Sequence, residues 1–233
     1  MRWDVVLDNA DILIGGMLVT VAASLITLLA STVLGLVLAL VRTTGPRPLR
    51  TLTRVYVEFV QNVPSLIIVL FLYHGLAQVG PRLTSFESAV VGLTIYSTAF
   101  MGEAIRSGIQ SVGRGQWQAA EASGLSFVEI MRLIILPQAL ALALPPLTNQ
   151  WVRLVKNTSL LSVVAGGDIL YHAIEISART FAVVPVYITI ALAYLALTVP
   201  LSRAADFFGE RIAWRRAALR RDEWANATLA AAD

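Results

Sequence analysis

Five long stretches of the chain contain no charged residue, and a charged residue borders each one at both ends. These stretches are residues 12–41, 59–81, 88–102, 133–152 and 180–202. A helix that crosses a bilayer needs about 20 mostly apolar residues, in a range of roughly 17–25. Four stretches reach this length. The third has only 15 uncharged residues, so a span there must bring Glu103 into or near the membrane.

This pattern predicts an all-α, polytopic membrane protein with five transmembrane helices. We expect a single transmembrane domain over residues 1–221, followed by a flexible tail over 222–233. The first span follows three aspartates and its apolar run exceeds that of a signal peptide, so we interpret it as retained. The expected spans are approximately 12–41, 57–80, 86–108, 127–156 and 181–203.

Composition agrees with a bilayer protein. Hydrophobic residues make up 57% of the chain, charged residues 14%, and the mean hydropathy is +0.71, whereas soluble domains average about 25% charged residues. The absence of cysteine excludes a disulfide framework and a thiolate metal site. His74 and His172 lie in unrelated segments, so no metal site is predicted.

The basic residues predict the orientation. Most of them follow the first, third and fifth spans, and cytoplasmic loops carry the Lys/Arg excess of membrane proteins. The N-terminus is therefore expected outside and the C-terminus in the cytoplasm. We attribute the net charge of +3 to this topology and expect no nucleic-acid partner. The residues that set the orientation are Arg42, Arg47, Arg50, Arg54, Arg106, Arg114, Arg132, Arg203, Arg211, Arg215, Arg216, Arg220 and Arg221.

The loop between the third and fourth spans differs from a plain connection. Residues 116–123 are mostly helix-favouring, and Gly124 is suited to end a helix in the left-handed conformation. Ser126 and Glu129 form an S-x-x-E capping box, which predicts that a second helix begins there. Pro137 is expected to kink that helix. The loop is either a docking surface for a soluble partner or a hairpin that packs on its own bundle.

The same loop resembles the signature of ABC importer membrane subunits, in which E-A-A-x-x-x-G is followed by nine residues and I-x-L-P. Further segments resemble the polar amino acid permease branch of that family, at 62–66, 98–109, 115–116 and 156–160. The loop residues that match are Ala119, Ala120, Gly124, Ile134, Leu136 and Pro137.

The resemblance implies a cytoplasmic coupling helix over approximately 115–124 that docks on an ABC ATPase. It also implies a second permease subunit, identical or homologous, an extracytoplasmic amino-acid-binding protein, and a place in the bacterial plasma (inner) membrane. The docking residues would be Gln116, Gln118, Ala119, Ala120, Glu121 and Gly124. Two positions depart from the family pattern. Gln118 stands where the family usually has a glutamate, and Glu121 could take over the role of that glutamate. Gln61 stands where many relatives have an arginine.

The chain has no nucleotide site of its own. Its only lysine, Lys156, lacks the glycine-rich loop of a Walker A motif, and neither G-x-S-x-G nor H-E-x-x-H occurs. We therefore expect no enzymatic activity and no cofactor in this chain, with ATP and Mg bound by the partner ATPase. The alternatives are a gradient-driven secondary amino acid carrier and a non-transporting scaffold. An odd number of spans and the lack of an internal repeat favour the importer over the carrier.

Polar residues at membrane depth are candidates for lining a translocation path. Placing a polar group inside the membrane costs free energy, so such groups often line a path for a substrate. An amino acid carries both charges, so carboxylate, guanidinium and amide groups suit it. Glu103 and Arg106 are three residues apart on a helix, however, and could simply pair with each other. The candidate path residues are Gln61, Asn62, Glu103, Arg106, Asn157 and Thr158.

Overall fold

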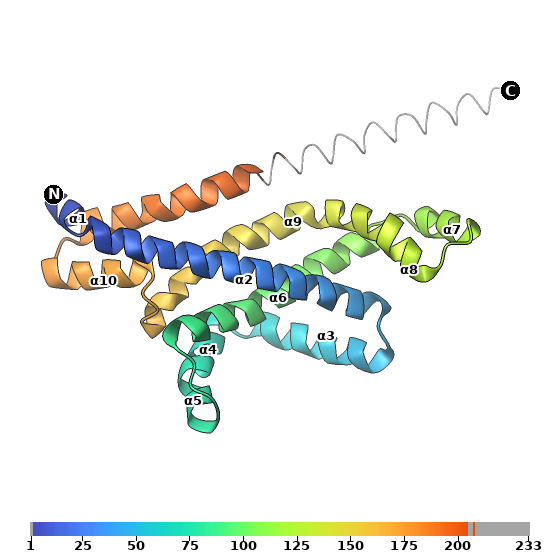
Figure 1. Cartoon of the computed structure of the whole chain (residues 1–233), viewed down its shortest axis with the longest axis horizontal. Helices are drawn as coiled ribbons and strands as arrows, with labels where there is room; N and C mark the ends of the chain where they lie inside the picture. Colours follow the sequence, from blue (N-terminus) through green and yellow to red (C-terminus); the bar gives the residue numbers. More distant parts are fainter. Residues whose placement is uncertain (1, 205–206, 208–233) are drawn as a thin grey trace.

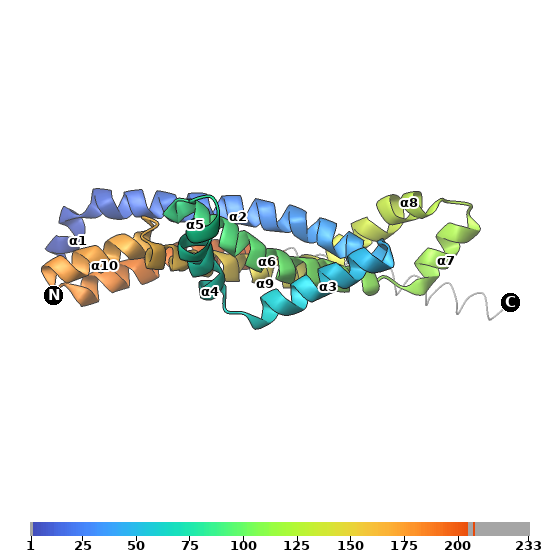
Figure 2. The same ribbon diagram turned by 90° about the horizontal axis from the view of Figure 1, so that it is seen from below.

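The longest helices run side by side along the length of the molecule (Figure 1, Figure 2). The computed structural model describes residues 2–204 and 207, and these form helices with no strand among them. Four helices are long and apolar enough to cross a membrane: α2 (Ala10–Thr44), α6 (Ser85–Gln110), the helical run Phe127–Val164 and the helix Val183–Ala204. They overlap the first, third, fourth and fifth expected spans. The expected tail, 222–233, lies outside the described residues.

The second expected span, 57–80, is not one straight helix. α3 (Arg47–Asn62) is followed by a run that comprises α4 (Ser65–Leu70), the π-helix η1 (Phe71–Gly75) and α5 (Leu76–Val79), and the two parts meet at 105°. Val63 is extended (φ −105°, ψ 133°) because a residue before proline avoids the helical region. The chain therefore changes direction at Val63–Pro64, and a fifth span results only if the bent pair crosses as one.

The fourth expected span is the most irregular of the long helical runs. It comprises α8 (Phe127–Glu129), the π-helix η2 (Ile130–Ile135), α9 (Leu136–Asn157) and the 3₁₀ helix η3 (Thr158–Val164). The π-turns immediately precede Pro137, which has no N–H to continue the α-helical hydrogen bonds. Pro145 and Pro146 lie inside α9. Only the π-turns of η2 therefore adjoin a proline at which the helix pattern changes, since α9 continues as α-helix through Pro145 and Pro146.

Small residues let the central helices approach closely. A Cβ added to Gly102 of α6 would lie 2.7 Å from Leu38 Cδ2 and 3.2 Å from the carbonyl oxygen of Gly35 on α2. A Cβ added to Gly108 would lie 2.4 Å from the carbonyl oxygen of Ala139 on α9. Close packing at small residues drives helix association in membranes, where the hydrophobic effect is absent. α6 is thus fixed between α2 and α9.

Asp168 is fully buried at the start of α10 (Ile169–Thr180), between the last two long helices. Its carboxylate accepts hydrogen bonds from the backbone N–H groups of Leu170 (3.2 Å) and Tyr171 (3.3 Å). Burial disfavours the charged form more than these bonds favour it, and raises the pKa of Asp168 from 3.8 to about 6.

This shift predicts a pH dependence of stability. Between pH 3.8 and about 6, the folded state binds more protons at Asp168 than the unfolded state does. The free energy of unfolding therefore falls as the pH rises through this window, and Asp168 causes no further change above it. The loss amounts to about 3 kcal/mol. Asp168→Asn keeps a capping oxygen and removes the titration. We expect its melting temperature in detergent, relative to wild type, to rise between pH 4 and pH 7; a constant difference would contradict the shift.

Candidate docking loop and polar cluster

The loop after α6 contains a short helix, α7 (Arg114–Ala122), with a well-defined end. Gly124 has φ +76°, as its place after the helix predicts. The N–H of Gly124 donates to the carbonyl of Glu121 (3.0 Å), and the N–H of Leu125 donates to the carbonyl of Ala120 (3.3 Å). These two bonds form a Schellman motif, which satisfies carbonyls at the helix end. Because φ is positive at Gly124, a side chain there would strain the backbone.

The predicted capping box is confirmed immediately after this turn. Ser126 Oγ accepts from the N–H of Glu129, and Glu129 Oε2 accepts from the N–H of Ser126 at 2.8 Å. The two helix ends therefore meet within four residues, and the loop has a fixed shape. Gln138 Nε2 also donates to Gln116 Oε1 at 3.2 Å, which ties α7 to α9.

The six predicted docking residues lie on two sides of α7. Ala120 is 3% exposed and belongs to the apolar core that contains Ile105, Ile130 and Ala139, so it faces the bundle. The rings of Trp117 and Phe127 stack beside it at 6.2 Å between centroids. The other five predicted residues are exposed and could meet a partner: Gln116, Gln118, Ala119, Glu121 and Gly124.

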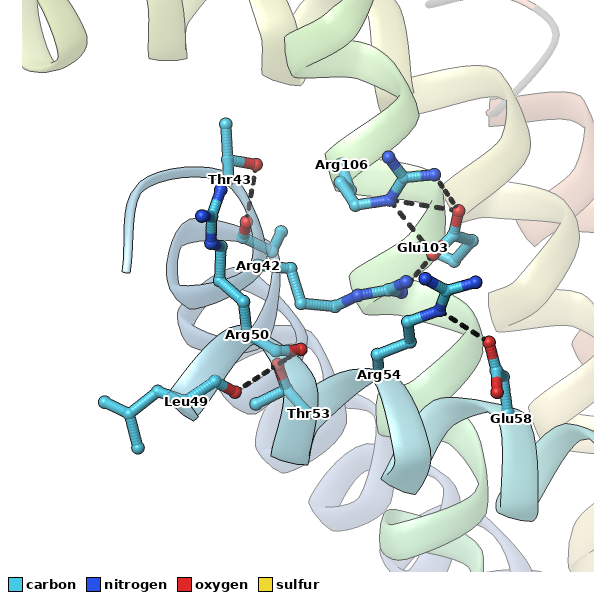
Figure 3. A network of polar contacts seen from close by, with 10 residues as sticks. Arg42, Thr43, Leu49, Arg50, Thr53, Arg54, Glu58, Glu103 and Arg106 are labelled. Carbon is cyan, nitrogen blue, oxygen red and sulfur yellow. Dashed lines mark hydrogen bonds and ion pairs between the residues drawn. The ribbon is translucent and has the colours of Figure 1, made fainter. Parts of the chain in front are cut away.

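Glu103 and Arg106 do pair, as their spacing suggests, and a third residue joins them. Arg106 Nε lies 3.1 Å from both carboxylate oxygens of Glu103, and its terminal nitrogen also bonds to Oε1. From the end of α2, Arg42 bonds to Oε2 of the same carboxylate. Figure 3 shows the two guanidinium groups on opposite sides of Glu103. The Arg42 side chain is 14% exposed and that of Glu103 35%.

The other candidate path residues lie elsewhere. Gln61 and Asn62 are exposed at the end of α3, where Asn62 Nδ2 donates to the carbonyl of Glu58 at 2.6 Å. Thr158 is buried at the start of η3 and donates to the carbonyl of Val155 at 2.7 Å, next to the partly buried Asn157. Within residues 2–204, no hydrogen bond or ion pair joins these two groups to each other or to Glu103. Among the six, the structure thus joins only Glu103 and Arg106 by hydrogen bonds, and the translocation path stays a prediction.

Arg42 is the member of the polar cluster that the sequence did not reveal. Its position after the first span marks the orientation, but the sequence does not show that the end of α2 packs beside the middle of α6. Within the described part of the chain, no group of three or more His, Asp or Glu could hold a metal ion. The described residues thus offer an exposed, rigid loop that could meet a partner and a polar cluster near the ends of α2 and α6.

Comparison with known proteins shows which protein family contains this docking-loop sequence and these spans. Residues 12–214 match the family model described as the binding-protein-dependent transport system inner membrane component. The chain is 46% identical over 212 residues to the probable glutamine ABC transporter permease protein GlnM of Bacillus subtilis, which covers 91% of this chain and 98% of that one. It is 33% identical over 202 residues to the glutamine transport system permease protein GlnP of Escherichia coli, covering 86% and 92%.

Solved structures agree on the fold. A crystal structure of an amino acid ABC transporter with histidines has a TM-score of 0.84 and 29% identity, covering 91% of this chain and 99% of that one. An inward-facing MetNI methionine ABC transporter has a TM-score of 0.71 at 18% identity, covering 86% and 96%, which shows the fold alone. The chain belongs to the binding-protein-dependent transport system inner membrane component family, the membrane-spanning subunits of ABC importers.

Proposed function

We propose that this chain forms the translocation path for a polar amino acid and couples it to ATP hydrolysis by a separate ATPase subunit. The observation that carries the proposal is the loop formed by α7 and Gly124, which presents five of the six expected docking residues to solvent while Ala120 anchors it in the core. A fixed helix held between α6 and α9 can transmit a partner's movement to the spans. Relatives named for glutamine support a polar amino acid as substrate.

The assembly follows from the same proposal. Two permease subunits, identical or homologous, pair around a central path, two ATPases bind the exposed residues of α7, and an extracytoplasmic binding protein delivers the amino acid. ATP and Mg belong to the ATPase. Nucleotide binding shifts the balance between two conformations because it favours one of them. Residues 57–80, which comprise the end of α3 together with α4–α5, serve as the second of five spans, with the N-terminus outside and the C-terminus in the cytoplasm.

Reconstitution tests this function. The permease is co-expressed with an ABC ATPase and an amino-acid-binding protein from the same organism, purified as a complex, and placed in proteoliposomes with glutamine outside. We expect the ATPase to co-purify, and uptake to require both ATP and the binding protein. Uptake that follows an ion gradient without ATP would instead establish the secondary carrier. Family membership and α7 both argue against that alternative.

Glu103 is the path residue with the sharpest test. Glu103→Gln keeps the shape of the side chain but leaves Arg42 and Arg106 without a counter-charge. We expect a stability loss of about 1–2 kcal/mol, below that of a fully buried pair because these groups are partly exposed, and a lower rate of uptake per folded molecule.

The matched control is Glu58→Gln, which breaks an ion pair with Arg54 whose side chains are 70% and 59% exposed. We expect this variant to lose little stability, because exposed ion pairs contribute little, and to transport normally. If Glu103→Gln lowers the melting temperature while uptake per folded molecule stays at the wild-type rate, Glu103 has a structural role and leaves the proposed path.

A further inference from the structure

The end of the molecule that carries the Glu103 cluster contains a hollow lined almost wholly by arginine. It has a volume of about 370 Å³ and lies between the end of α2, the start of α3 and the inner part of α6. Figure 3 shows several of these side chains around the α2–α3 turn. The lining residues are Arg42, Arg47, Arg50, Thr51, Arg54 and Arg106.

The arginines of the hollow exceed the carboxylates that neutralise them. Glu103 is shared by Arg42 and Arg106, and Glu58 pairs with Arg54. Arg47 and Arg50 are exposed, and within the described part of the chain neither forms an ion pair. In Figure 3, Arg50 extends away from both carboxylates. Five guanidinium groups against two carboxylates leave a charge of +3 that an anion can neutralise.

The geometry suits a phosphate group. Guanidinium presents a planar set of donors that binds phosphate oxygens in pairs. Arg47 is also the first residue of α3, a helix of 16 residues, and the positive end of a helix dipole favours an anion. Arg47, Arg50 and Arg54 recur at spacings of three and four, so they share one face of α3.

A second, apolar face of α3 indicates which kind of molecule carries the phosphate. Leu52, Val55 and Phe59 are exposed and also recur at spacings of three and four, which forms an apolar stripe beside the basic one. A helix with a basic face and an exposed apolar face lies at a membrane interface, with its apolar side among the acyl chains. Basic pockets between spans on the cytoplasmic side bind the head groups of anionic lipids.

We propose that the arginine hollow binds the phosphate of an anionic phospholipid, with Arg47 and Arg50 as its free partners and the apolar stripe of α3 against the lipid chains. This inference goes beyond transport. Since Arg42 and Arg106 also hold Glu103, the bound head group lies next to the link between α2 and α6.

The test uses the purified complex in detergent and dioctanoyl phosphatidylglycerol as the probe, with affinity measured by native mass spectrometry. Each arginine near a membrane surface contributes roughly a fivefold factor to the binding of anionic lipid. We therefore expect the double variant Arg47→Gln and Arg50→Gln to bind this lipid about 25-fold more weakly. Dioctanoyl phosphatidylcholine should bind the wild type more weakly than phosphatidylglycerol.

The control removes the same charge elsewhere. Arg132 and Arg203 are exposed and lie outside the hollow, so their double variant to glutamine should bind lipid like wild type. An equal loss in both double variants would show diffuse attraction and overturn the site. Displacement of the lipid by inorganic phosphate at equal concentration would also overturn the proposal, because it would show that the hollow binds a free anion. A variant that keeps lipid but loses the ATPase would identify a protein contact instead.

Discussion

Replacing Gly124 with valine is expected to lower binding-protein-stimulated ATP hydrolysis by about tenfold or more while the permease still inserts in the membrane. Gly124 has φ +76°, and a Cβ there meets no atom within 4 Å, so the effect comes from the backbone alone. The left-handed conformation costs about 1–2 kcal/mol for an ordinary residue and more for a β-branched one. The valine variant would relieve this strain by unwinding the end of α7.

Asparagine separates this backbone effect from others, because it tolerates the left-handed region. We expect Gly124→Asn to retain most of the activity of wild type in the same proteoliposome assay. Gly115→Ala is a second control, since Gly115 lies inside α7 and its Cβ would also meet nothing. Normal stimulated hydrolysis in Gly124→Val would separate α7 from the coupling step and leave it as a surface hairpin.

The largest effect on folding is expected at Gly108. Its added Cβ would lie 2.4 Å from the carbonyl oxygen of Ala139 and 2.9 Å from Ala143 Cβ, so even alanine must push α6 and α9 apart. Overpacking of this kind typically costs about 1–3 kcal/mol, and leucine would cost more. We expect Gly108→Ala to lower the melting temperature in detergent clearly, and Gly108→Leu to prevent recovery of folded protein.

Gly15 supplies the control for Gly108. It lies inside α2, and a Cβ there would meet no atom within 4 Å. Gly15→Ala removes a flexible residue from a helix at no steric cost, so it should leave the melting temperature unchanged or raise it slightly. Equal melting temperatures for Gly108→Ala and Gly15→Ala would show that α6 and α9 have room to separate.

The hydrophobic pattern predicts the long helices well because it reports directly on contact with lipid. Four of the five charge-free stretches coincide with long apolar helices. The turn at Gly124 and the capping box at Ser126 are also local, since each depends on a few neighbouring residues. Such features can be predicted from a single sequence because no distant contact decides them.

The hydrophobic pattern does not predict features that depend on distant contacts or on the direction of the backbone. The second span bends by 105° at Val63–Pro64, although the apolar run continues through it, because hydrophobicity does not record a change of direction. The pairing of Arg42 with Glu103 joins residues 61 positions apart and depends on the close contact of α2 with α6 at Gly35 and Gly102. The six candidate path residues share polarity and expected depth, and that they line one path stays a prediction.

The burial of Ala120 has a consequence for how motion spreads through the protein. Its methyl group lies in the same core as Ile105 of α6, Ile130 of η2 and Ala139 of α9. Dense packing transmits displacement because it leaves no slack between neighbouring atoms. We therefore expect a sideways shift of α7 to displace the adjoining parts of α6 and α9, so that a force applied outside the bilayer reaches the helices within it.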